Sequence, residues 1–340
     1  MHNSAPEYLF GAQLPEAGDT LPIRPGLHWL RMPLPFALDH INLWLLADGD
    51  AWLAIDSGID SPDTRTHWSR IMQQHRLCGV LATHSHPDHI GLAHWLCAQA
   101  GVPLHASAAE YAYARLLSLD AAGVSNEDLI AHFIRHGMPP QLAQQMQQRK
   151  SHYPKLVPAL PHSYRRLMHG QILRIGGNDW RIICCAGHSP EHVCLYQAEM
   201  GVLIAGDMVL PRISTNVSVF ALEPHGNPLQ QYLDGLQCLA QLPADTLVLP
   251  SHGSPFRGLH ARIAELHTHH ESRLEEVLQA CREKPCSAAE IVPLMFKRAL
   301  DVHQLVFAYG EAIAHLNKLN VDAKLAITHG SDLIIRYQAL

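Results

Sequence analysis

The nine residues 83–91, THSHPDHIG, constrain this chain more than any other stretch, because they place four potential metal ligands within six positions. These ligands are His84, His86, Asp88 and His89. Histidine is the commonest metal ligand in proteins, and aspartate is rarely buried without a partner. The cluster therefore predicts a metal site, and it requires a fold that brings further ligands to the same place.

The local pattern predicts how these side chains are presented. Residues 80–86 (VLATHSH) are expected to form a short buried strand, in which the two-residue period puts His84 and His86 on the same side. Pro87 stops this strand, Asp88 is expected at an N-cap, and a helix is predicted over 89–101. The four ligands then converge at the C-terminal edge of a sheet.

Apolar runs separated by turn residues predict the rest of the fold. The expected elements are a hairpin of strands 41–47 and 51–56, a helix over 61–75, strands at 172–175, 180–185, 193–198 and 202–207, a helix over about 228–241 and a strand over 246–253. Two β-rich halves interleaved with helices favour the α/β class, as a four-layer αββα sandwich.

Two segments depart from this pattern. A helical, irregular and basic insert is expected at about 106–170. Residues 272–340, with three helices and a hairpin, are expected to form a winged-helix-like domain that follows a catalytic domain of residues 1–271.

Three more strand ends carry side chains that bind metals. His188 follows the strand 180–185, Asp207 follows the strand that begins at 202, and His252 follows the strand that begins at 246. Together with the first four residues they give seven candidate ligands. That number suits two metals that share one bridging carboxylate.

The order HSHPDH, then His188, Asp207 and His252, resembles the HxHxDH…H…D…H pattern of the metallo-β-lactamase superfamily, over residues of about 20–260. The resemblance implies a first metal held by His84, His86 and His188, a second held by Asp88, His89 and His252, and Asp207 as the bridge. The stretch LAIDSG resembles an early strand end of that family, which implies that Asp56 orients a ligand histidine. The expected cofactors are two divalent ions, with zinc favoured over iron or manganese.

The resemblance also implies a reaction. Two such metals lower the pKa of a shared water, so hydrolysis by a metal-bridging hydroxide is expected. Asp88 and Asp207 are the predicted catalytic residues, which position this nucleophile and carry its proton. The pattern is similar to the glyoxalase II and thioesterase-like branch, which acts on thioesters or esters. Antibiotic-cleaving members lack the carboxylate equivalent to Asp207, so a β-lactamase, like a lactonase, ranks below this prediction.

The composition of the insert favours an anionic substrate such as an acyl-CoA or acyl-glutathione. Residues 129–178 contain no Asp or Glu but hold seven basic residues, namely Arg135, Arg149, Lys150, Lys155, Arg165, Arg166 and Arg174. Such a segment can attract an anion to the metals. A solvated loop with a chance bias in charge is the alternative. The predicted substrate contacts are His192, Arg165, Arg166, Tyr164 and Tyr153, although His192 could instead simply pack.

Two other functions stay open. The winged-helix-like tail allows a metal-dependent nuclease or phosphodiesterase that acts on single-stranded RNA or a nucleotide. However, residues 272–340 hold eight Lys or Arg against eight Asp or Glu, and the chain has a net charge of −6, so no nucleic-acid partner is expected. A neutral tail favours packing or a homodimer. The third function is a metal-binding protein without turnover.

The expected cellular location rests on three sequence patterns, namely those of signal peptides, membrane spans and paired cysteines. The N-terminus shows no signal-peptide pattern, and no apolar run approaches the ~20 residues of a membrane span, so no membrane partner is expected. The eight cysteines form no CxxC pair and are expected to be reduced and buried. A cytoplasmic location is the resulting expectation.

Overall fold

The computed structural model describes residues 6–36, 38–148 and 153–340 of the chain. The chain forms two compact units. The first comprises Met1–Leu119, Tyr153–Thr215 and Gly235–Ile263, and the second comprises Asp120–His152, Asn216–Asp234 and Ala264–Leu340. The second unit thus joins the C-terminal segment to part of the insert and to residues 216–234. The predicted domain boundary between residues 271 and 272 stays a prediction.

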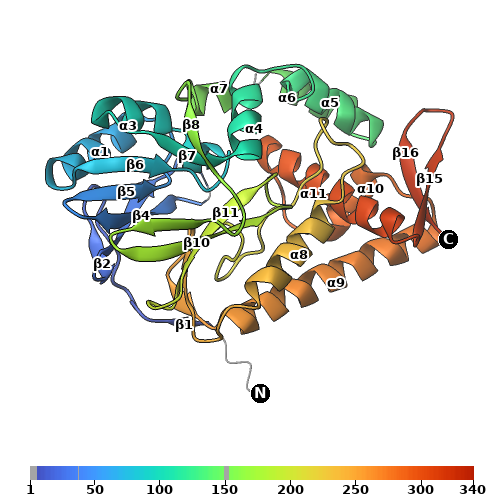
Figure 1. The fold of residues 1–340 in the computed structure, drawn as a ribbon. Coiled ribbons are helices and arrows are strands. Elements are labelled where there is room, and N and C mark those ends of the chain that lie inside the picture. The colour runs from blue at the N-terminus through green and yellow to red at the C-terminus, as the bar shows by residue number, and fades with distance from the viewer. Residues whose placement is uncertain (1–5, 37, 149–152) are drawn as a thin grey trace. The chain divides into compact units, whose positions relative to one another are not determined.

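The first unit contains two seven-stranded sheets (Figure 1). The strands of the first sheet, in spatial order, are β2 (Leu21–Arg24), β3 (Leu27–Pro33), β4 (His40–Asp48), β5 (Ala51–Ile55), β6 (Leu77–Leu81), β7 (Leu104–Ser107) and β8 (Tyr164–Leu167). β4 and β5 pair antiparallel with Asp48 opposite Ala51, which confirms the predicted hairpin. β5 to β8 are parallel, so the residues that follow them meet at one edge of the sheet.

The second sheet supplies the other strand ends. Its strands, in spatial order, are β1 (Glu7–Tyr8), β14 (Phe256–Arg257), β13 (Leu247–Pro250), β12 (Val202–Gly206), β11 (His192–Gln197), β10 (Asn178–Cys185) and β9 (Ile172–Ile175). β12 and β13 are parallel, with Gly206 opposite Pro250. This register places the residues after the two strands, Asp207 and His252, side by side at one edge.

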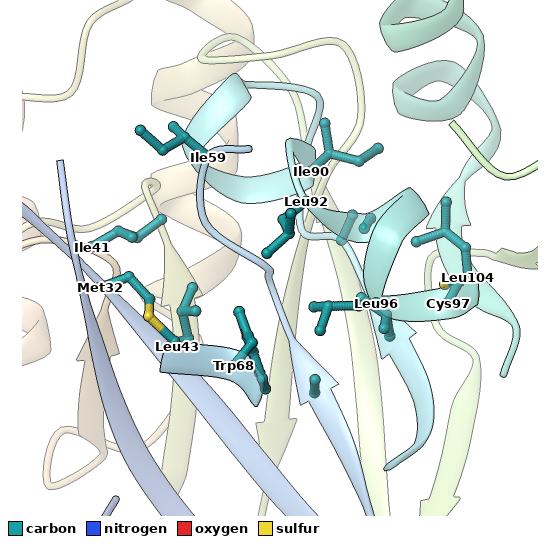
Figure 2. Packing of buried hydrophobic residues seen from close by; sticks show 14 of the residues in the cluster. Met32, Ile41, Leu43, Ile59, Trp68, Ile90, Leu92, Leu96, Cys97 and Leu104 are labelled. Atoms are coloured by element: carbon teal, nitrogen blue, oxygen red, sulfur yellow. The ribbon is translucent and has the colours of Figure 1, made fainter. Parts of the chain in front are cut away.

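Alternation along the strands divides the core of the first unit into two layers. On β4, Leu43 packs in a cluster under the helices, whereas Trp44 packs in a cluster between the sheets. Figure 2 shows part of the first cluster, in which Trp68 lies beside Leu43 and Leu96 lies toward Cys97 and Leu104. The second cluster combines buried residues from both sheets. A central strand such as β4 is therefore covered on both faces by buried apolar side chains.

Helices cover the outer faces and complete the predicted αββα sandwich. α1 (Pro62–Gln74) and α3 (Ala93–Ala100) lie on the first sheet. α1 begins after Ser61, whose side chain accepts the N–H of Thr64 as an N-cap. On the second sheet, Cys185 Sγ donates to the backbone oxygen of Gly235 in α8 (Pro228–Leu239) at 3.9 Å. The α/β fold class predicted from the sequence is confirmed.

The insert is more regular than expected. It forms α4 (Ala108–Ser118), α5 (Asn126–Arg135), α6 (Pro140–Gln148) and α7 (Tyr153–Leu156), which confirms its helical character. Its last part is strand β8, parallel to β7 with Arg165 opposite His105, so the expectation of an irregular segment there is wrong. β8 forms because it satisfies the backbone groups of β7, which would otherwise be a sheet edge. Arg149 and Lys150 lie outside the described residues.

The second unit is mainly helical. Besides α5 and α6 it contains most of α9 (Leu259–Glu283), α10 (Ala288–Met295), α11 (Val302–Val321) and a hairpin of β15 (Leu325–His329) and β16 (Ile335–Ala339). The three helices and the hairpin predicted for the C-terminal segment are present, and α9 starts earlier than predicted. In the part of the chain that the structure describes, no helix combines the length and apolarity needed to cross a bilayer.

A buried carboxylate in α11 predicts how stability changes with pH. Burial raises the pKa of Glu311 to about 7, against a hydrogen bond from Asn216 and the charge of Arg273. Since the folded pKa lies above the ordinary value of 4.5, the folded state binds the proton more tightly. The free energy of unfolding should therefore fall as the pH rises from about 4.5 to about 7.

Glu311→Gln should lack this contribution, because an amide does not ionise. Chemical unfolding of both proteins at pH 5 and pH 8 measures the difference. Between these pH values wild type should lose stability relative to the variant, by roughly 3 kcal/mol at most. Equal pH dependence in the two proteins would show that Glu311 does not ionise over this range.

Candidate metal centre

The THSHPDHIG segment leaves the first sheet earlier than predicted. β6 ends at Leu81, and the last sheet-like bond joins Ala82 N to His105 O at 2.9 Å. The next amide, Thr83 N, donates to Asp56 Oδ1 at 2.7 Å. A side chain thus replaces the neighbouring strand as the acceptor. His84 and His86 lie in a loop, so the prediction that strand alternation aligns them is wrong.

The helix after this loop is also shorter than predicted. α2 (Pro87–Ile90) begins with Pro87 at its first position, where a missing N–H costs nothing, and this makes His86 the N-cap instead of Asp88. The predicted helix 89–101 is interrupted at Gly91 and Leu92. There Gly58 O accepts the N–H of Leu92 at 3.0 Å, and α3 starts anew at Ala93. Asp88 is left in the first turn.

Four of the seven predicted ligands form what we call the first group, His84, His86, His188 and Asp207. Their ligand atoms all lie within 4.8 Å of one another. His84 Nε2 lies 2.9 Å from His86 Nδ1 and 3.2 Å from His188 Nε2. His188 Nε2 lies 3.4 Å from Asp207 Oδ2. Three imidazole nitrogens and one carboxylate oxygen therefore face a common point.

The other three ligands form the second group, Asp88, His89 and His252, with ligand atoms within 4.8 Å of one another. Asp88 Oδ2 lies 3.4 Å from His252 Nε2 and 3.7 Å from His89 Nε2. Asp207 reaches this group with its other oxygen, since Oδ1 lies 3.6 Å from His89 Nε2 and 3.7 Å from His252 Nε2. One carboxylate thus touches both groups, as a bridging ligand would.

Two ligand histidines are fixed through their other ring nitrogen. His89 Nδ1 lies 2.8 Å from Asp56 Oδ2, and His252 Nδ1 lies 2.8 Å from the backbone oxygen of His40. These bonds leave Nε2 of each ring to face the second group. Asp56 adopts a φ of 63°, which aspartate tolerates better than most residues. The structure places it where the sequence predicted, against a ligand histidine.

The electrostatics favour protonation states that suit a metal. Burial lowers the pKa of His84 well below its ordinary value, and burial with the neighbouring His188 lowers that of His86 to about 3. Both rings therefore offer lone pairs. Although burial opposes it, the imidazoles of His252 and His89 hold the pKa of Asp207 well below its ordinary range. Neutral imidazole and ionised carboxylate are the forms that bind metals.

The second group differs from the first in the pKa of a histidine, which is raised and not lowered. Burial opposes ionisation of Asp88, but the charge of His89 lowers its pKa to about 2. For His89 itself, burial is outweighed by the carboxylates of Asp56, Asp88 and Asp207, which raise its pKa well above the ordinary value. A metal at this group would therefore replace a proton on His89.

Two buried atoms test whether the site fits a metal. Within the described segments of the chain, His89 Nε2 and Asp207 Oδ1 have no hydrogen-bond partner. Buried polar atoms seldom stay unsatisfied unless an ion or water completes them. The two atoms are 3.6 Å apart, and two ligands of one tetrahedral zinc are roughly 3.4 Å apart. The donor set and its spacing fit a metal ion.

Two predicted substrate contacts turn inward. His192 is fully buried, and its Nε2 accepts the N–H of Asp207 at 3.1 Å. A side chain on Gly206 would overlap this ring, which shows how closely the backbone approaches it. The Tyr153 hydroxyl donates to Ser85 O at 2.5 Å. Both residues support ligand-bearing segments in this structure, and their contact with substrate stays a prediction.

The other predicted contacts lie on β8. Tyr164 stacks on Tyr111 with ring centroids 4.1 Å apart. Arg165 and Arg166 are exposed. Burial raises the pKa of Cys184 to about 12, and the positive charge of Arg166 opposes this rise. Exposed cations are thus present on the edge strand beside β7.

One residue beside the ligands is absent from the sequence-based predictions. Glu110 is fully buried and accepts hydrogen bonds from both ligand-bearing loops. The available signal was its place three residues after β7, at the sheet edge where the ligands gather. A single glutamate inside a helix does not otherwise stand out.

Known proteins are similar to this chain in sequence and in fold. Residues 37–252 match the family described as the Metallo-beta-lactamase superfamily, and residues 274–340 match the Metallo-beta-lactamase-like, C-terminal domain. The chain is 26% identical over 311 residues to the probable metallo-hydrolase YqjP of Bacillus subtilis (strain 168), covering 88% of this chain and 93% of the relative.

Two crystal structures are also similar. A beta-lactamase domain protein from Burkholderia ambifaria is 49% identical with a TM-score of 0.93, and the match covers 98% of each chain. A metallo-beta-lactamase family protein from Thermus thermophilus is 28% identical with a TM-score of 0.78, covering 94% of this chain and all of the other. The family match spans more than half of the residues and includes every ligand of both groups. The chain therefore belongs to the metallo-beta-lactamase superfamily and, within it, to the hydrolases.

Proposed function

We propose that the chain is a dinuclear metal-dependent hydrolase that cleaves a thioester or ester by direct attack of water. The observation that supports this most is the position of Asp207, whose two oxygens face the first and the second group separately. His84, His86 and His188 would hold one ion, Asp88, His89 and His252 the other, with Asp207 between them. Zinc is the favoured metal for this donor set.

Bound at these residues, a metal pair would supply an activated water and an electrophile for the substrate oxygen. The chain's own residues supply orientation and proton transfer. His86, Asp88 and His188 are partly exposed, while His84 and His89 are fully buried, so substrate would enter on the side of the exposed residues. Asp88, as the partly exposed carboxylate, would position water and receive its proton at Oδ1, the oxygen that does not face His89 and His252.

We further propose an anionic acyl substrate, such as an acyl-CoA or acyl-glutathione. The support is the stretch without acidic residues, 129–178, together with the exposure of Arg165 and Arg166 on β8. These exposed basic side chains would raise the local concentration of an anion.

The test combines metal analysis with a substrate panel of acyl-CoAs, acyl-glutathiones, lactones, a chromogenic cephalosporin and single-stranded RNA. Wild type loaded with zinc should hydrolyse a thioester, and a folded His86→Ala variant should not. If zinc-loaded wild type hydrolyses no member of the panel faster than His86→Ala does, the hydrolase proposal fails for these substrates. RNA cleavage without thioester turnover would reverse the ranking in favour of a nuclease.

Charge reversal on β8 tests the substrate class. Arg165→Glu with Arg166→Glu should raise KM for an anionic thioester by roughly tenfold and leave kcat unchanged, because the basic residues attract substrate without touching the reacting atoms. Arg174→Glu, at an exposed arginine on β9 paired with Asp179, is the matched control. An unchanged KM in the double variant, or the same rise in the control, would contradict the role of β8.

The remaining expectations accompany this proposal. We propose a cytoplasmic enzyme, in keeping with eight cysteines that are all free and lie within the described segments, although Cys238 is exposed where a buried residue was expected. The C-terminal hairpin, with its exposed Ile327 and Leu333, is the surface we would assign to a homodimer. We also propose that residues 272–340 form a winged-helix-like domain that packs or dimerises and does not bind nucleic acid.

A further inference from the structure

We propose that Glu110 is a positioning residue, which ties the loop of His84 and His86 to the loop of His188 and so sets the geometry of the first group. This inference rests on the proposed function, because it concerns residues that would hold one of the two metals. Glu110 itself does not face the ligand atoms, so it would act only through the loops that it joins.

The hydrogen bonds of Glu110 reach both loops. Its Oε2 accepts the N–H of Ser85 at 2.8 Å, and Ser85 stands between His84 and His86. Its Oε1 accepts the Ser189 hydroxyl at 2.7 Å and the N–H of Glu191 at 2.6 Å. Each oxygen of one carboxylate therefore serves a different loop. A shift of Glu110 would therefore act on the loop of His84 and on the loop of His188 together.

The helix that carries Glu110 is itself attached to the second loop. α4 follows β7 directly, and Ser107 Oγ donates to the backbone oxygen of Glu191 at 2.9 Å. In return, the Glu191 carboxylate accepts the N–H of Ala109 at 3.1 Å. These bonds join the end of a strand in the first sheet to a loop of the second sheet. Glu110 is thus anchored at the place where the two sheets bring their ligands together.

The burial of Glu110 indicates that its carboxylate is present because of the hydrogen bonds that it accepts. Its side chain is fully buried, and the three donors that it accepts from are uncharged. Burying a carboxylate costs several kcal/mol unless strong hydrogen bonds offset the loss of water. Three short bonds provide this, and an apolar residue in the same space would leave the three donors without an acceptor. What the carboxylate adds is a fixed distance between two loops.

The peptide between the two histidines is held from both sides. Glu110 takes the N–H of Ser85, and the Tyr153 hydroxyl donates to the carbonyl oxygen of Ser85 at 2.5 Å. With its donor and its acceptor both engaged by side chains, Ser85 has little freedom to rotate. His84 and His86 are consequently presented in one arrangement before any metal arrives. Such pre-arranged ligands bind a metal more tightly than mobile ones.

Zinc competition with a chromophoric chelator, on the full-length protein, tests this inference. Glu110→Gln replaces one acceptor oxygen by an NH2 group that must face a donor. It should weaken one of two zinc-binding steps by about 10- to 100-fold, the range for residues that orient ligands. Asp56→Asn removes the charge beside His89 and keeps a residue that tolerates the positive φ, so it should weaken the other step.

Two further variants guard against a general loss of structure. Glu311→Gln, at another buried glutamate, should change neither step. Ser189→Ala removes only one donor to Glu110, so it should weaken the same step as Glu110→Gln by a smaller factor. If circular dichroism shows that Glu110→Gln is unfolded, Ser189→Ala decides alone, and an unchanged affinity in it overturns the inference.

The outcomes separate this inference from the proposed function. Two zinc ions bound by wild type, with one step weakened in Glu110→Gln and the other in Asp56→Asn, supports both. Two ions bound equally well by wild type and Glu110→Gln overturns the positioning role and leaves the hydrolase intact. Wild type that binds no zinc overturns the proposed function and the inference with it.

Discussion

Replacing Asp207 by alanine is expected to lower turnover by about 100-fold or more, and to reduce the metal content of the purified protein. Asp207 reaches both ligand groups, with Oδ2 at 3.4 Å from His188 and Oδ1 at 3.6 Å from His89. Without it, the two groups lose their shared negative charge. Elemental analysis after dialysis and thioester turnover with zinc in excess measure the two effects.

A matched control for this variant is Asp179→Ala, since Asp179 is an exposed carboxylate paired only with Arg174 among its salt bridges. It should keep both the metal content and the turnover of wild type. Full turnover by Asp207→Ala at a normal metal content would contradict the bridging role. Full turnover that appears only at high zinc would mean that Asp207 contributes affinity alone.

Gly91→Ala is expected to destabilise the protein by about 3 kcal/mol or more. A methyl group at this position would overlap the carbonyl oxygen of Pro87 and would lie 2.7 Å from Leu156 O and 3.0 Å from Gly58 O. All three atoms belong to the backbone, so none can turn aside as a side chain would. The segment after the ligand helix would have to move. Chemical unfolding followed by circular dichroism measures the loss.

Gly101→Ala separates the effect of space from that of backbone conformation. Gly101 caps α3 with a φ of 67°, but nothing lies within 4 Å of a methyl group built there. Its substitution should cost only about 1–2 kcal/mol, the penalty for a left-handed residue. If Gly91→Ala costs no more than Gly101→Ala, then the close approach of the three carbonyl groups does not determine the choice of glycine at position 91.

The two groups of candidate ligands could be predicted because histidine and aspartate are residue types that bind metals. His84, His188 and Asp207 each follow an apolar run, and the ends of neighbouring strands meet in any sheet of this kind. The αββα layers followed from the same runs, since alternation on β4 separates Leu43 from Trp44. Fold and ligand set both depend on patterns that repeat along the chain.

The local geometry of the ligands was less predictable, because it depends on partners far away in sequence. β6 ends where Asp56, the residue that follows β5, accepts the N–H of Thr83. Helix α2 stops where Gly58 O accepts the N–H of Leu92. Strand and helix patterns describe the local preferences of the chain. They do not indicate that a residue distant in sequence will accept a hydrogen bond from the backbone and so end the strand or the helix.

The same reason explains why Glu110 was missed and why Tyr153 and His192 were given other roles. Each of these side chains makes a hydrogen bond to a backbone group of a loop that is distant in sequence. Since every residue has a backbone, the identity of the residues does not indicate which backbone group will be bound. Ser85 looks like a spacer between two histidines in the sequence, yet its N–H and C=O are both engaged. Positioning residues of this kind become visible only when the donors and acceptors of the loops are counted.

The seven ligands are divided between the two sheets, four after β6 and three at strand ends of the second sheet. An ion held by His84 and His188 would therefore close a loop of roughly a hundred residues and act as a removable cross-link between the sheets. Binding of this kind stabilises only the folded chain. When metal is scarce in a cell, the protein would then lose activity and would also be degraded faster by proteases. The amount of protein in the cell would therefore follow the supply of metal.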